Sequence, residues 1–112
     1  MHAMQIGFNS EYADAAPTID EINALQGLVL LEFGAPWCGH CQASRMAVEE
    51  VMKNHPKQVH IKIFDGKGKR LGRQFGVKLW PTLILLRNGQ EIERIVRFTS
   101  VEEVRDLMAL GA

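Results

Sequence analysis

Hydrophobic and polar residues follow strand periods in several segments of the chain. LVLLEF at 28–33 is apolar at every position except Glu32, a pattern typical of a strand that is buried on both faces of a sheet. Other short apolar or alternating segments lie between turn residues and indicate further strands. Strands are therefore also predicted at 59–64, 82–87 and 91–98, with a short edge strand at 5–8.

Helical signals lie between these strands. Two capping boxes predict helices over 18–25 and 100–110, since Thr18 and Ser100 are each followed three residues later by a glutamate. A longer helix is predicted from Cys38 onward, because apolar residues recur there at helical spacing. That apolar stripe comprises Ala43, Ala47, Val48, Val51 and Met52, and RLGRQF at 70–75 is a further short helix.

The order of these elements, (β)αβαβαββα, predicts an α/β fold. We expect a central mixed sheet of four or five strands with helices on both faces. Asn88-Gly89 between the last two strands is a strong signal for a tight hairpin. The 112 residues contain no internal repeat and no linker-like segment, so a single domain over residues 1–112 is expected. Its first residues, up to about residue 16, are weakly patterned, and we expect them to form a loosely ordered extension.

Composition narrows the range of partners. The 13 basic and 13 acidic residues give a formal net charge of zero, so no bulk attraction to nucleic acid or to an anionic membrane is expected. The longest apolar runs, LVLL and LILL, are too short to cross a bilayer. The N-terminus lacks the charged and apolar regions of a secretory signal. We therefore expect a cytoplasmic protein, in a compartment that keeps thiols reduced.

Cys38 and Cys41 are the only cysteines and lie two residues apart in WCGHC. They could hold a metal, form an inert or structural pair, or exchange electrons. A stable zinc site has four ligands, and the chain has neither a second CxxC nor histidines at ligand spacing, so no metal is expected. A disulfide that closes so short a loop would constrain the unfolded chain little, which disfavours a structural role. A redox couple is therefore the preferred interpretation.

The expected position of the pair, at the N-terminus of a helix, supports redox chemistry. Unpaired backbone N–H groups and the helix dipole stabilise an anion there, and thiolate is the reactive form of cysteine. We expect Cys38 to be the attacking nucleophile and Cys41, one turn later, to be the resolving thiol. His40 adds partial positive charge beside Cys38, which favours the reduced thiolate form and makes the disulfide more oxidising.

WCGHC, WPT at 80–82 and the Asn-Gly hairpin have the order and spacing found in the thioredoxin superfamily, which the chain resembles over residues 18–110. This form of the cysteine motif is similar to that of protein disulfide isomerase domains, whereas bacterial thioredoxins usually carry Gly-Pro between the cysteines. The resemblance implies a thioredoxin fold and an enzyme that reduces protein disulfides through a Cys38–Cys41 cycle. A disulfide isomerase or oxidase and a non-catalytic protein-binding module remain the alternatives.

The same resemblance implies a monomer with two kinds of partner. One is a protein disulfide substrate, and the other is a thiol reductant or flavin-dependent reductase that restores the dithiol. No tightly bound cofactor is implied. A basic stretch that follows the third strand is either a solvated surface or a docking patch for an acidic partner or a reductase, and it comprises Lys67, Lys69, Arg70, Arg73 and Lys78.

Glu32 receives a catalytic role from the resemblance, because it matches a buried carboxylate six residues before the motif. Burial should raise its pKa, and it would take the proton of Cys41 as that thiol attacks. Lys62 could approach Glu32 from a neighbouring strand and tune it.

Substrate contacts are implied for residues on both sides of the cysteines. Pro81 matches a cis-proline that faces the motif and leaves the backbone of the preceding residue free to pair with an extended substrate. Trp37 would shield the thiols and offer an apolar contact. The expected substrate-binding residues are Trp37, Gly39, His40, Trp80 and Pro81.

The chain departs from the family pattern at four positions. Trp80 replaces a smaller residue before the proline, so a bulky ring would either narrow substrate choice or stack on a substrate. Gly34 replaces an aromatic residue, which would loosen the packing around the motif. The other two departures are Met46, in place of a helix-kinking proline, and Gln42, in place of a basic residue. Together, the four departures argue against the interpretation that this chain is the housekeeping thioredoxin, but they leave the thiol chemistry intact.

Overall fold

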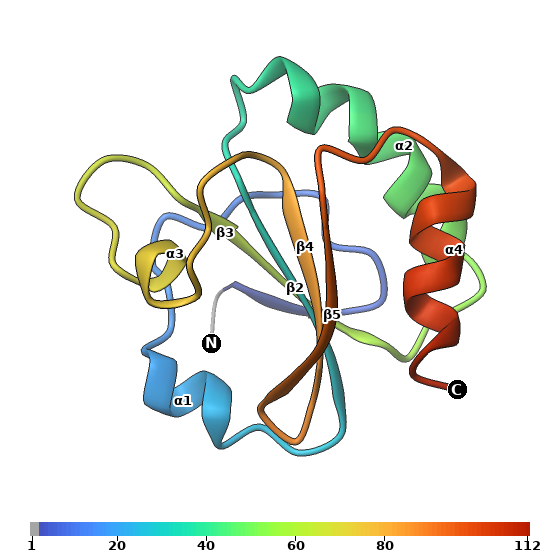
Figure 1. Cartoon of the computed structure of the whole chain (residues 1–112), viewed down its shortest axis with the longest axis horizontal. Helices are drawn as coiled ribbons and strands as arrows, with labels where there is room; N and C mark the ends of the chain where they lie inside the picture. Colours follow the sequence, from blue (N-terminus) through green and yellow to red (C-terminus); the bar gives the residue numbers. More distant parts are fainter. Residues whose placement is uncertain (1–2) are drawn as a thin grey trace.

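A five-stranded sheet in the order β1-β3-β2-β4-β5 forms the centre of the molecule (Figure 1). The structure is a computed structural model that describes residues 3–112. β2 and β3 run parallel, and the other neighbouring strands run antiparallel, so the predicted mixed sheet is confirmed with five strands. The strands are β1 (Met4–Ile6), β2 (Leu28–Gly34), β3 (Val59–Phe64), β4 (Thr82–Arg87) and β5 (Gln90–Val96).

Helices cover both faces of the sheet, as predicted (Figure 1). They are α1 (Ile19–Asn23), α2 (Gly39–Met52), α3 (Leu71–Gln74) and α4 (Val101–Ala109). The odd-numbered residues of β2 pack in one apolar cluster with α1 and α3, whereas Leu30 packs in another with α2 and α4. Because side chains alternate between the faces of a strand, Glu32 lies on the same face as Leu30. A carboxylate is thereby placed beneath the helix that carries the cysteines.

Local sequence signals define the ends of these elements. Thr18 and Ser100 cap α1 and α4, each in a complete capping box. Asn88 and Gly89 have φ angles of 51° and 79° and make the tight turn between β4 and β5. None of the described helices is long and apolar enough to cross a membrane.

The buried face of α2 differs from the predicted stripe at one position. Ala47, Val48 and the following apolar residues are buried, but the prediction for Ala43 is wrong, because this residue is exposed. Ser44 takes its place on the buried face and donates a hydrogen bond to the carbonyl oxygen of Cys41 at 3.0 Å. A polar residue is accepted there because its hydroxyl has a partner.

The N-terminal segment packs against the sheet, although a loosely ordered extension was expected. β1 pairs antiparallel with β3. It begins at Met4, one residue before the start of the predicted edge strand. Asn9 is buried, and its side-chain amide donates to the carbonyl oxygens of Ala3 and His60 at 2.8 and 3.1 Å. These bonds tie the segment to β3. Residues 1 and 2 of the expected extension lie outside the described residues.

Candidate active site

Cys38 and Cys41 lie where the chain passes from β2 into α2. Cys38 is the N-cap residue of α2, and its Sγ accepts a hydrogen bond from the backbone N–H of Cys41 at 3.2 Å. Both are free thiols; Cys38 is half-buried, whereas Cys41 is only 3% exposed. The N–H donor and the helix N-terminus place positive partial charge beside this sulfur. The more accessible thiol therefore lies at the helix N-terminus, with the buried thiol one turn behind it.

Burial determines the protonation of Cys41. Loss of solvent, together with the neighbouring Cys38, raises the pKa of Cys41 from 9.0 to about 11, so this thiol holds its proton at neutral pH. Part of the rise comes from the hydrogen bond and the charge of Cys38. A mixed disulfide at Cys38 would remove that charge. The proton of Cys41 would then be easier to remove at the point in a redox cycle when Cys41 must attack.

Glu32 lies buried beneath α2, and both of its carboxylate oxygens have a partner. The Tyr12 hydroxyl donates to Oε2 at 2.9 Å, and His60 Nε2 lies 3.0 Å from Oε1. Lys62 Nζ is 3.9 Å from Oε2. The predicted direction of the Glu32 pKa shift is wrong. Burial by itself raises the pKa, but the bond with His60, the charge of Lys62 and the bond from Tyr12 outweigh it and hold the pKa of Glu32 below 4.5.

His60 is held in one orientation by a backbone donor. The N–H of Asn9 donates to His60 Nδ1 at 3.0 Å, and the ring is fully buried. Because Nδ1 accepts this bond, the proton of the neutral ring is on Nε2, which therefore donates to Glu32. The ring thus supplies a fixed donor to the carboxylate.

Lys62 approaches Glu32, as the sequence suggested, from the position directly opposite it in the β2–β3 register. Its side chain is almost fully buried. The ammonium nitrogen lies 4.4 Å from the centroid of the Tyr12 ring and 5.7 Å from that of Phe8. Two aromatic faces and one carboxylate therefore compensate a charge that would be costly to bury alone.

Pro81 lies at the same end of the sheet as the cysteine motif. The Trp80–Pro81 peptide bond is cis, as the resemblance implies. Thr82, the next residue, pairs with Phe33 near the end of β2, which fixes this placement. Trp80 Nε1 donates to Asp65 Oδ2 at 2.9 Å, so the bulky ring is anchored to the loop after β3. Within residues 3–112, the backbone N–H of Trp80 has no hydrogen-bond partner.

An exposed rim surrounds Cys38. The side chain of Trp37 is 66% exposed, and its ring packs edge-on against Phe64 with the centroids 5.0 Å apart. Gly39 and His40 are exposed on the first turn of α2. The surface around Cys38 is therefore exposed.

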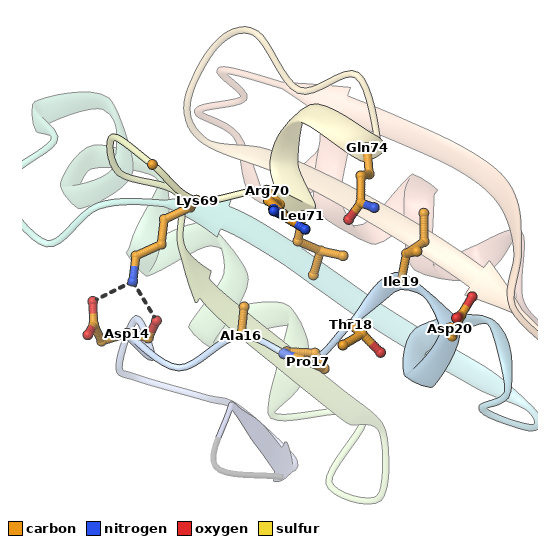
Figure 2. A pocket seen from close by; sticks show the side chains of 11 residues that line it. Asp14, Ala16, Pro17, Thr18, Ile19, Asp20, Lys69, Arg70, Leu71 and Gln74 are labelled. Carbon is orange, nitrogen blue, oxygen red and sulfur yellow. Dashed lines mark hydrogen bonds and ion pairs between the residues drawn. The ribbon is translucent and has the colours of Figure 1, made fainter.

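A groove of about 480 Å³ between residues 14–20 and 68–74 is separate from this site, since it shares no residue with it (Figure 2). At one end, Lys69 donates to the carboxylate of Asp14 at 3.0 Å, so one cation of the basic stretch is already paired. Across residues 3–112, no group of three or more histidine, cysteine or acidic side chains has the geometry of a metal site.

Three residues of the site were missed by sequence reasoning: Tyr12, Asn9 and His60. Tyr12 and Asn9 belong to the weakly patterned N-terminal segment, and no local signal connects them with residues 20 to 51 positions away. His60 had a usable signal, because it alternates with Lys62 on a strand next to the one that carries Glu32. Such alternation suggests one polar face, and here that face is buried.

Comparison with known proteins agrees with this geometry. The thioredoxin family model matches residues 13–109. Thioredoxin of Chlamydia muridarum is 40% identical over 70 residues, which are 62% of this chain and 69% of that protein. Thioredoxin of Bacillus subtilis is 32% identical over 84 residues, 74% of this chain and 81% of that protein. The structure of reduced thioredoxin 2 from Pseudomonas aeruginosa superposes with a TM-score of 0.83 at 44% identity, covering 92% of this chain and 96% of that one.

Proposed function

The chain belongs to the thioredoxin family of thiol–disulfide oxidoreductases, and we propose that it reduces disulfide bonds of other proteins with Cys38 and Cys41. One observation carries the proposal: the Cys38 sulfur caps α2 and accepts an N–H bond, while Cys41 is buried and protonated behind it. One thiol is prepared to attack, and the other is held back until it is needed.

In the first step, the Cys38 thiolate attacks one sulfur of the substrate disulfide. A mixed disulfide forms between Cys38 and the substrate, and the second substrate sulfur leaves as a thiolate. In the second step, the Cys41 sulfur attacks Cys38 Sγ and gives up its proton. The Cys38–Cys41 disulfide forms, the bond to the substrate breaks, and two electrons have passed to the substrate.

Glu32 is the proposed acceptor of the Cys41 proton. Its carboxylate is ionised at neutral pH because its pKa lies below the ordinary value. A carboxylate that is ionised at neutral pH is available there, although it is a weak base. The proton therefore stays on Cys41 in the resting protein and moves as the sulfur–sulfur bond forms.

The rim around Cys38 is the proposed substrate-binding surface. An extended substrate segment would pair with the free N–H of Trp80 beside Pro81, as an added strand does. The exposed ring of Trp37 would supply an apolar contact, and the exposed first turn at Gly39 and His40 would leave room for the substrate backbone.

A thiol reductant or a flavin-dependent reductase is the proposed recycling partner. It would return two electrons to the Cys38–Cys41 disulfide and restore the dithiol. The proposed direction of electron flow requires a reducing compartment such as the cytoplasm.

Trapping of the mixed disulfide tests the proposal. The Cys41→Ser protein, incubated with a disulfide-containing protein, should accumulate a covalent adduct at Cys38 that a thiol reagent releases. The Cys38→Ser protein should give no adduct, and the unaltered protein should reduce the substrate over many cycles with a chemical reductant. Equal partner binding without any adduct would instead support a non-catalytic binding module.

A disulfide isomerase or oxidase is the second candidate, and His40 favours it. The imidazole lies in the exposed turn next to Cys38, where its partial positive charge would stabilise the reduced form. Both candidates use the same residues, so only the direction of electron flow distinguishes them. The reduction potential of the cysteine pair measures that direction.

A further inference from the structure

The hydroxyl of Tyr12 lies near both the resolving thiol and the buried carboxylate. It donates to Glu32 Oε2 at 2.9 Å, and Tyr12 lines the same small cavity as Cys41. Tyr12 comes from the N-terminal segment, well separated in sequence from both groups that it joins. No direct contact between Cys41 and Glu32 is needed if the hydroxyl links them.

Gly34 provides the space for this arrangement. A Cβ at this position would lie 2.6 Å from Cys41 Sγ and 2.7 Å from the Tyr12 hydroxyl, closer than a carbon atom can approach either group. The position of this Cβ is thus close to both Cys41 Sγ and the Tyr12 hydroxyl, so these two groups are neighbours. Gly34 was expected to loosen the packing around the motif; instead, the Tyr12 ring fills the space.

We propose that Tyr12 is a catalytic residue of the resolving step and that its hydroxyl passes the proton of the Cys41 thiol to the Glu32 carboxylate. This inference rests on the thiol–disulfide cycle proposed above. A hydroxyl suits the role because it can accept one hydrogen bond while it donates another.

Two protons move in this step. The Cys41 S–H proton moves to the Tyr12 oxygen while the Tyr12 O–H proton moves to Glu32 Oε2. Tyrosine is neutral before and after, Glu32 becomes a carboxylic acid, and the Cys41 sulfur attacks Cys38 Sγ. The Cys38–Cys41 bond forms, the bond from Cys38 to the substrate breaks, and the substrate sulfur leaves as a thiolate. Glu32 then loses its proton to solvent.

The surrounding charges suit a transfer between buried groups. One negative charge moves from Glu32 toward Cys41, so no additional charge has to be buried. A cavity of about 120 Å³ adjoins both Tyr12 and Cys41, and the basic residues Arg45 and Lys62 also line it. These cations can stabilise the negative charge at either end of the relay.

Two-phase kinetics with an aromatic disulfide reagent (Ellman's reagent) test the proposal, because each step releases one coloured thiolate. The first phase depends on reagent concentration and reports attack by Cys38. The second does not, and it reports resolution by Cys41. In Tyr12→Phe we expect the second phase to slow about ten- to hundredfold, the effect of losing a hydrogen bond to a charged group, while the first phase changes less than about twofold.

The pH profile separates a relay from a structural effect. The second phase of the unaltered protein should be nearly independent of pH around neutrality, because Glu32 is ionised there. In Tyr12→Phe and in Glu32→Gln it should rise about tenfold per pH unit, since bulk solvent must then remove the Cys41 proton. Ser10→Ala, which removes another hydroxyl beside the same cavity, should behave like the unaltered protein.

Each outcome has one meaning. A second phase of unaltered rate and flat pH profile in Tyr12→Phe would overturn the role of Tyr12 and leave the proposed function standing. Absence of a second phase in the unaltered protein would overturn the proposed function itself. If Tyr12→Phe fails to fold, the unaltered protein decides: transfer of two protons predicts a curved dependence of the second phase on solvent deuterium fraction, and a linear one contradicts it.

Discussion

His60 donates a hydrogen bond to Glu32 across two parallel strands, with 3.0 Å between Nε2 and Oε1. The ring is in the tautomer that donates from Nε2 because its Nδ1 accepts the N–H of Asn9. This bond is one reason that a fully buried glutamate has a lowered pKa. The carboxylate beneath the cysteines is thus fixed in position and kept ionised by its neighbours.

Replacing His60 by alanine should destabilise the protein at neutral pH. The change leaves Oε1 of the buried Glu32 carboxylate and the N–H of Asn9 without a partner, so we expect the free energy of unfolding to fall by about 3 kcal/mol. Urea unfolding at pH 7 measures the loss. The same replacement at His55, whose ring makes no hydrogen bond within residues 3–112, is the matched control and should cost under about 1 kcal/mol. Equal losses would contradict the role assigned to His60.

Alkaline pH should destabilise the reduced protein through Cys41. The pKa of this thiol is about 11 in the folded protein and 9.0 ordinarily, so between these pH values the unfolded chain has released a proton that the folded chain retains. Stability therefore falls as the pH rises through this window, by at most about 3 kcal/mol in total. Reduced Cys41→Ala keeps Cys38, Tyr12 and Glu32 and should lack this part of the loss. Parallel curves of stability against pH for the two proteins would show that burial does not raise the pKa of Cys41.

Trp80 should control the protonation of Asp65. Burial raises the pKa of Asp65, and the hydrogen bond from Trp80 opposes that rise. In Trp80→Phe, which keeps an aromatic ring but loses the donor, the acid dissociation constant of Asp65 should fall roughly tenfold. A carbon-13 NMR titration of the carboxyl group measures it. Trp37→Phe should leave the titration unchanged, and an unchanged titration in Trp80→Phe would mean that the ring is not anchored there.

Gly89 should tolerate a side chain less well than another glycine of similar backbone conformation. Both Gly89 and Gly76 have positive φ angles, 79° and 70°. A Cβ at Gly89 would overlap the carbonyl oxygen of Asn23, whereas one at Gly76 would meet nothing within 4 Å. Thermal or urea unfolding should therefore show a loss of about 1 kcal/mol for Gly76→Ala and at least about 2 kcal/mol for Gly89→Ala. A smaller loss at Gly89 would contradict the close packing of the hairpin on α1.

Local signals were sufficient to predict most of the fold. Capping boxes at Thr18 and Ser100 and the turn at Asn88 depend on neighbours within a few residues, so the sequence displays them directly. The placement of Glu32 beneath α2 follows from strand alternation alone. The prediction that Ala43 is buried is wrong because the hydrophobicity of a small residue at the edge of an apolar stripe says little about its burial.

The surroundings of Glu32 could not be predicted in the same way. Tyr12, Asn9 and His60 reach the site through contacts between distant parts of the chain, and two of them come from a segment without a periodic pattern. The direction of the Glu32 pKa shift depends on a balance between burial and these donors. Without the donors, burial alone suggests a raised pKa, whereas the pKa of Glu32 in the folded protein is lowered.

The reduction potential of the Cys38–Cys41 pair tests the central claim most directly. Equilibration with glutathione buffers of known ratio, followed by the fluorescence of nearby Trp37, gives the value. We expect a potential near the established thioredoxin figure of about −270 mV, low enough to reduce disulfides of other proteins. A value near the roughly −180 mV of protein disulfide isomerase would contradict the reductase assignment and make the protein a donor or shuffler of disulfides.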